Sequence, residues 1–114
     1  MSTITIHHVR ETGVKADLHL YCGRNHWKYP HLTNAGLGNP FEMTHEDMRN
    51  AVCEAYKLSL EQDWQPHREQ HLKVIQRIAL RLSEGKSVAL YCHCYPQACH
   101  CDVIKRRALE TITP

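Results

Sequence analysis

The chain is 114 residues long, with 42% hydrophobic and 23% charged residues, which is typical of one ordinary globular domain spanning residues 1–114. Its formal net charge is only +2 with the histidines neutral, which argues against a protein that binds nucleic acid mainly by electrostatic attraction. No apolar run approaches the roughly 20 residues needed to span a bilayer, and the N-terminus lacks a signal-peptide pattern, so we expect a cytoplasmic protein with no membrane partner.

The first half of the sequence predicts two strands and a long loop. Residues 3–9 and 17–22 alternate apolar and polar side chains, the pattern of strands with one buried face. Residues 23–42 contain three glycines, two prolines and three asparagines without any period, which predicts a long loop. Loops of this length in compact domains commonly carry function.

The second half predicts three helices and one buried strand. A capping-box signal at Thr44 starts a helix that should run to about Gln62. A second helix begins near Pro66 and stops at Gly85. Residues 87–92 are an apolar run typical of a buried strand, and residues 102–112 form a closing helix with acidic Asp102 in its first turn.

This order of elements predicts a small Rossmann-like, three-layer α/β domain, with a short and mostly parallel sheet flanked by about three helices. Ligands of open α/β sheets collect outside the carboxyl ends of the strands, often at a helix N-terminus. The segment Cys92–Cys101 falls at such a place, between the buried strand and the closing helix.

Four thiols and two imidazoles lie within that segment, a density that core filling does not explain. In an intracellular protein such cysteines are expected to be free thiols or metal ligands, whereas the isolated Cys22 and Cys53 are expected to be buried, inert thiols. One interpretation is a zinc site, in which the ligands are Cys92, Cys94, Cys99 and either His100 or Cys101.

Two other interpretations compete with zinc. Cys99 lies at the start of a helix beside His100, where the helix dipole would lower the pKa of the thiol and make Cys99 and His100 a catalytic pair. Alternatively the segment is structural, with Cys92 and Cys94 facing the core and His100 capping the turn.

Three motifs occur together in the order Gly23-Arg24, Gly38-Asn39-Pro40-Phe41 and Cys92-x-Cys94-x-Pro96-x-x-Cys99-His100. With them the chain resembles, from about residue 17 to 109, the family of domain of unknown function 4326. The resemblance implies a small Rossmann-type α/β protein of the kind common in bacteriophages and bacteria, and it implies no particular activity. Cys101 stands where the family generally has Gly or Ala, and Cys22 where it has a β-branched residue. The additional thiol at Cys101 favours a metal over catalysis.

The matched positions suggest a ligand site. Arg24 follows a strand and could present its guanidinium to a phosphate, with a surface ion pair as the alternative. Gly38 and Asn39 form a turn, and Asn39 could hydrogen-bond a base or sugar. The leading hypothesis is that Arg24, Gly38 and Asn39 converge with Cys99 and His100 on a nucleotide-like or other phosphate-bearing small molecule, with catalysis left open.

The alternative hypothesis belongs to another class of protein. It is a non-catalytic, zinc-stabilised phage module, active in the host cytoplasm, that binds a host protein or nucleic acid. Zinc coordinated by Cys92, Cys94, Cys99 and Cys101 distinguishes this hypothesis, because a structural metal is released by chelators and its loss destabilises the fold.

Overall fold

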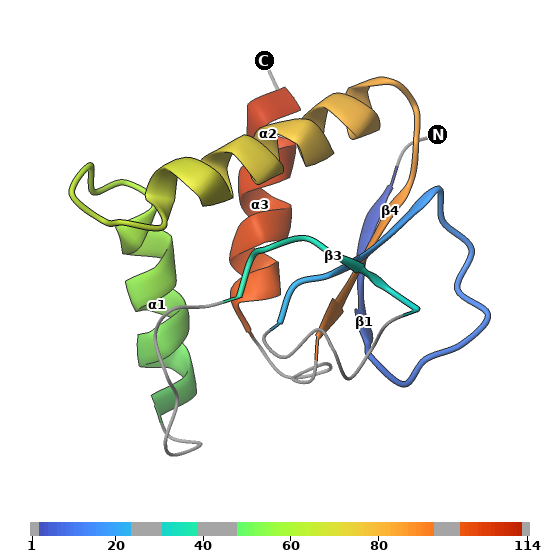
Figure 1. Cartoon of the computed structure of the whole chain (residues 1–114), viewed down its shortest axis with the longest axis horizontal. Coiled ribbons are helices and arrows are strands. Elements are labelled where there is room, and N and C mark those ends of the chain that lie inside the picture. The colour runs from blue at the N-terminus through green and yellow to red at the C-terminus, as the bar shows by residue number, and fades with distance from the viewer. Residues whose placement is uncertain (1–2, 24–30, 39–47, 93–98, 113–114) are drawn as a thin grey trace.

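The computed structural model describes residues 3–23, 31–38, 48–92 and 99–112 (Figure 1). The chain is an α/β domain with a parallel sheet and three helices, as the sequence predicts. Its elements in chain order are β1 (Ile4–His8), β2 (Leu18–Tyr21), β3 (Thr33–Asn34), α1 (Arg49–Ser59), α2 (Arg68–Ser83), β4 (Val88–Cys92) and α3 (His100–Ile112).

The four strands form one sheet in the order β1-β4-β2-β3, and all neighbouring pairs are parallel. Strand β4 lies between β1 and β2, and all five of its residues are buried. This placement agrees with its continuous apolar sequence, because a central strand of a covered sheet has no solvent face. The carboxyl ends of all four strands lie at the same edge of the sheet.

Side chains alternate across the sheet, so its two faces have different cores. Val88, Leu90 and Cys92 face the helices, and α1, α2 and α3 all lie on this side (Figure 1). On the opposite side Ala89 and Tyr91 pack with loop residues that include Val9, Val14, Ala16 and Leu32. In the described part of the chain, loops rather than a helix therefore form the third layer.

The helices follow their apolar periodicity. The apolar residues at helical spacing in α2 are Leu72, Ile75, Ile78, Ala79 and Leu82, and all of them except the partly buried Leu72 are buried. Burying each of the larger side chains contributes about 1.5–3 kcal/mol. The chain leaves α2 through Gly85, whose φ of +85° is accessible to glycine at little cost. Helix α2 packs across α3, so it also fixes the position of the helix that follows the cysteine segment.

Element boundaries depart from prediction in three places. Helix α1 ends at Ser59 rather than near Gln62, and the predicted start of this helix lies outside the described residues. The predicted loop contains the short strand β3. This strand is not predicted because two residues are too few to show a periodicity. Helix α3 begins at His100, two residues earlier than predicted. Within the described ranges, no helix is long and apolar enough to cross a membrane.

Candidate metal centre

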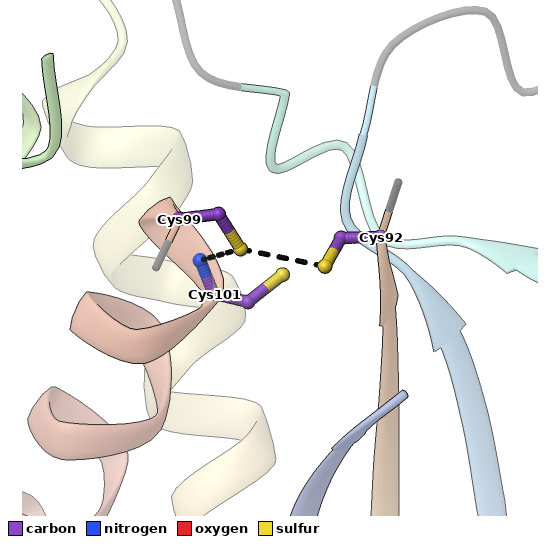
Figure 2. A group of neighbouring side chains, drawn as sticks. All are labelled: Cys92, Cys99 and Cys101. Carbon is purple, nitrogen blue, oxygen red and sulfur yellow. Dashed lines mark hydrogen bonds between the residues drawn. The ribbon is translucent and has the colours of Figure 1, made fainter. Parts of the chain in front are cut away.

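Three cysteine thiols converge where β4 ends and α3 begins. The thiols of Cys92, Cys99 and Cys101 all lie within 4.8 Å of one another, and all three residues are buried (Figure 2). Cys92 is the last residue of β4, and Cys101 lies in the first turn of α3. The group could therefore hold a metal ion between the sheet and the helix that covers it.

The sulfur separations are close to those that a tetrahedral metal requires. With Zn–S bonds of about 2.3 Å, the sulfurs of a tetrahedral site lie about 3.8 Å from one another. The sulfur of Cys99 is 3.4 Å from that of Cys92, and the upper bound for the three is 4.8 Å. Thiolates are also the donors that zinc and other soft metal ions prefer.

Local hydrogen bonds hold Cys99 at the N-cap of α3, directly before its first residue. Its sulfur accepts a bond of 3.4 Å from the backbone N–H of Cys101, and its own N–H donates to Asp102 Oδ2 at 2.9 Å. This reciprocal arrangement is a capping box, with sulfur in place of the usual hydroxyl. It explains why α3 begins earlier than predicted. It also means that Asp102 already occupies part of the helix N-terminus where an anion would bind.

Burial and the neighbouring thiols oppose the predicted lowering of the Cys99 pKa. The contact with Cys101 lowers the pKa of Cys99, but the hydrogen bond with Cys92 and burial outweigh it and raise the pKa well above its ordinary value. Contacts with the thiols of Cys22, Cys92 and Cys99, together with burial, likewise raise the pKa of Cys101. Neighbouring neutral thiols stabilise one another, whereas a bound cation would reverse this preference.

His100 is buried, and its ring is hydrogen-bonded to the protein backbone. Its Nε2 lies 2.6 Å from the carbonyl oxygen of Cys22, which can only accept, so Nε2 is the protonated nitrogen. That bond ties the start of α3 to the end of β2. Of the two predicted fourth members of the group, Cys101 is therefore with the thiols, and the Nε2 of His100 is engaged elsewhere.

A buried polar network adjoins the cysteines between α1 and α2. The Tyr56 hydroxyl shares a hydrogen bond of 2.8 Å with His71 Nδ1, and the Tyr56 ring packs edge-on against His100. Burial raises the pKa of Tyr56, and the nearby thiols of Cys22 and Cys101 raise it further. Burial lowers the pKa of His71 to about 4, with smaller contributions from His67 and His100. These groups are held neutral beside the cysteines.

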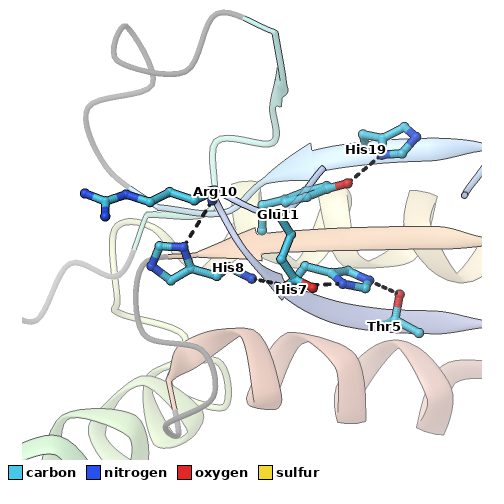
Figure 3. A network of polar contacts seen from close by, with 7 residues as sticks. Thr5, His7, His8, Arg10, Glu11 and His19 are labelled. Carbon is cyan, nitrogen blue, oxygen red and sulfur yellow. Dashed lines mark hydrogen bonds and ion pairs between the residues drawn. The ribbon is translucent and has the colours of Figure 1, made fainter. Parts of the chain in front are cut away.

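The opposite face of the sheet carries a second polar network (Figure 3). His19 Nδ1 lies 2.8 Å from the Tyr91 hydroxyl, and His7 Nε2 lies 2.7 Å from Thr5 Oγ1. Glu11 accepts a bond of 2.7 Å from the backbone N–H of His8. A shallow hollow of about 750 Å³ on this face is lined by His19, Tyr91 and Glu11, among others.

The predicted ligand residues are described only in part. Arg24, Asn39 and Cys94 lie outside the described residues. Gly38 is half-buried and follows β3 along the chain. Cys99 and His100 are both buried, and each is engaged with protein atoms.

Cys22 lies beside the cysteine group, a position that its sequence context does not predict. Cys22 is fully buried, as predicted, but its thiol interacts with that of Cys101 rather than only with apolar side chains. A signal was present in the sequence, because the tripeptide Leu-Tyr-Cys occurs at residues 20–22 and again at 90–92. The two copies end neighbouring parallel strands. Cys53, which was predicted to be buried as well, is only partly buried.

Comparison with known proteins places the chain in a family without assigning a function. A search of curated proteins and a search of solved structures each returned no match. The model of the family described as domain of unknown function (DUF4326) matches residues 6–110, which is most of the chain. The chain therefore belongs to the DUF4326 family.

Proposed function

We propose that this protein is a non-catalytic module stabilised by zinc, which the thiolates of Cys92, Cys99 and Cys101 bind. The observation that carries the proposal is the convergence of three buried thiols, from the end of β4 and the start of α3, within 4.8 Å. A zinc ion at this position would join the sheet to α3 through covalent-strength bonds. Its binding free energy would then contribute directly to the stability of the fold.

The surroundings suit bound thiolates better than a free nucleophile. Cys99 is only 5% exposed, so an incoming substrate has little access to its sulfur. The bond from the Cys101 N–H and the positive end of α3 would both stabilise a negative sulfur. The thiolates formed when a metal ion replaces the thiol protons would therefore already be oriented toward it, and part of their negative charge would be offset by these groups.

Native mass spectrometry of the protein purified without added metal tests the proposal, in parallel with thermal melting before and after chelation. We expect about one zinc per chain and a melting temperature that falls on chelation and recovers with added zinc. A metal-free protein whose melting temperature is unchanged by chelator would contradict the proposal. Recovery of Cys92 and Cys99 as a disulfide would also contradict it, because oxidised sulfurs cannot act as thiolate ligands.

A second candidate function is binding of a nucleotide-like or other phosphate-bearing molecule near Gly38 and the Cys99–His100 segment. It is supported by the four parallel strands, whose carboxyl ends lie at one edge of the sheet beside the start of α3. The Asp102 carboxylate at that helix end would repel a phosphate, which weakens this candidate. Calorimetric titration with a nucleoside diphosphate tests it. Heat of binding that is lost in Arg24→Ala would support the candidate, and no heat would remove it.

A further inference from the structure

We infer that Cys22, rather than Cys94, is the fourth ligand of the metal, so that the centre is a Cys₄ site joining β2, β4 and α3. The inference rests on the proposed zinc site and identifies the residue that completes it. Its basis is the register of the sheet and the interaction between the Cys22 and Cys101 thiols. A closed set of four thiolates is the usual composition of a structural zinc site.

The strand register brings Cys22 beside Cys92. Leu20 pairs with Leu90 and Tyr21 with Tyr91, so the next residue on each strand is a cysteine. The ladder continues at this point, because the Cys22 N–H donates to the Tyr91 carbonyl at 3.1 Å. Adjacent strands lie about 4.8 Å apart, and residues in register share a face. Cys22 and Cys92 therefore belong to the same face, the one that α3 covers.

Helix α3 supplies the other side of the site. The Cys101 thiol interacts with those of Cys22, Cys92 and Cys99. The sulfurs of Cys92, Cys99 and Cys101 already lie within 4.8 Å of one another, and the Cys22 sulfur would move toward an ion held by these three. Cys22 and Cys101 are both 0% exposed, so no water competes with them for a metal. Two ligands from parallel strand ends and two from the first turn of a helix would enclose an ion from opposite sides.

A hydrogen bond to its backbone carbonyl also fixes the position of Cys22 relative to α3. Its carbonyl accepts the 2.6 Å bond from His100 Nε2, which ties β2 to the residue between Cys99 and Cys101. The Cys22 sulfur donates only a long bond of 3.8 Å to the Leu20 carbonyl. Because this bond is weak, a metal would displace it easily. His100 then acts as a positioning residue for the ligand and not as a ligand itself.

Cobalt(II) titration of the metal-free full chain tests the inference, since the sulfur-to-cobalt charge-transfer absorption increases with the number of thiolate ligands. The wild type should give the absorption of a tetrahedral Cys₄ site. In Cys22→Ser that absorption should fall by about a quarter, because one of four thiolates is lost. Affinity for the ion should fall at least about tenfold, the lower end of the loss seen when metal-site partners are removed.

Two matched variants are the controls. Cys94→Ser and Cys53→Ser each remove one cysteine, and both should retain the full wild-type absorption. If Cys22→Ser does not fold, Cys94→Ser decides the matter alone, because reduced absorption in that variant would identify Cys94 as the ligand and overturn the inference. Wild-type absorption in Cys22→Ser would overturn the inference while leaving the proposed zinc site intact. A wild type that takes up no cobalt would overturn both.

Discussion

The two faces of the sheet differ in how their polar side chains are surrounded. Tyr91 and Cys92 are consecutive residues of β4, yet one belongs to the loop-covered face and the other to the helix-covered face. On the loop-covered face His19 pairs with Tyr91 beside an open hollow, where water can also satisfy polar atoms. On the helix-covered face the thiols lie among buried groups and contact one another.

This difference supports the proposal that the cysteines bind a metal. A buried polar group needs a partner, because an unsatisfied one costs about 1–3 kcal/mol. Thiols are weak partners for one another, whereas a metal ion satisfies all of them at once. If the proposed metal is bound, the stability of the helix-covered face should depend on it, and that of the loop-covered face should not.

The largest expected effect comes from Cys101→Ala. Loss of this thiol should weaken zinc binding at least about 100-fold, since removing even an outer partner of a metal site costs 10–100-fold. His19→Gln, on the loop-covered face, is the matched control and should leave zinc affinity within about twofold of the wild type. Competition with a zinc-binding dye measures both. Equal zinc affinities for the two variants would contradict the claim that only the helix-covered face binds the metal.

Acid should destabilise the helix-covered face through His71. Its pKa of about 4 in the folded protein lies below the ordinary value of 6.5, so the unfolded chain binds more protons between these two values. The stabilisation is complete above about pH 6.5 and is lost as the pH falls toward 4, by roughly 2–3 kcal/mol.

Urea unfolding between pH 7 and pH 4 measures this loss. His71→Gln should flatten the dependence of the unfolding free energy on pH, because glutamine does not titrate. Both proteins keep the same thiols, so the contribution of the metal cancels in the difference. Parallel pH profiles for the wild type and His71→Gln would show that another group is responsible.

The two tyrosine–histidine pairs offer a direct comparison of the faces. Both pairs have a bond of 2.8 Å, but Tyr56–His71 is buried and Tyr91–His19 is only partly buried. Tyr56→Phe should lower the unfolding free energy by about 1–3 kcal/mol, because His71 Nδ1 is left unsatisfied. Tyr91→Phe should cost about 0.5–1 kcal/mol, since water can replace the hydroxyl. Chemical denaturation of both variants would reveal any reversal of this order.

The last prediction concerns the cap of α3. Asp102→Ala removes the acceptor for the Cys99 N–H and should cost about 0.5–2 kcal/mol of stability. Glu110→Ala, an exposed residue near the other end of the same helix, should change the unfolding free energy by less than about 0.5 kcal/mol. The melting temperatures of the two variants measure this difference in stability. A larger shift for Glu110→Ala would mean that the cap does not hold the start of α3.

The sequence predicted those features that depend on local patterns. The apolar run of β4 and the stripe of α2 are found where the periodicity places them, because burial repeats along a strand or helix at a fixed interval. The density of cysteines between residues 92 and 101 likewise marked the region where three thiols converge.

Features that depend on which elements become neighbours were not predictable in this way. Nothing local in β2 says that it pairs with β4, so Cys22 was interpreted as an isolated, inert thiol. The pKa of Cys99 was predicted from the helix dipole, which is local. Burial and the contact with Cys92, which oppose the dipole, arise only from the folded packing. The repeated Leu-Tyr-Cys tripeptide becomes informative once the strands are known to be parallel neighbours.

X-ray absorption at the zinc edge of the purified wild-type protein tests the central claim most directly, because it reports the kind and number of atoms bound to the metal. We expect one zinc per chain with a shell of four sulfur atoms at about 2.3 Å. A shell that contains nitrogen or oxygen would contradict the Cys₄ site. A protein that contains no zinc would contradict the metal centre as a whole.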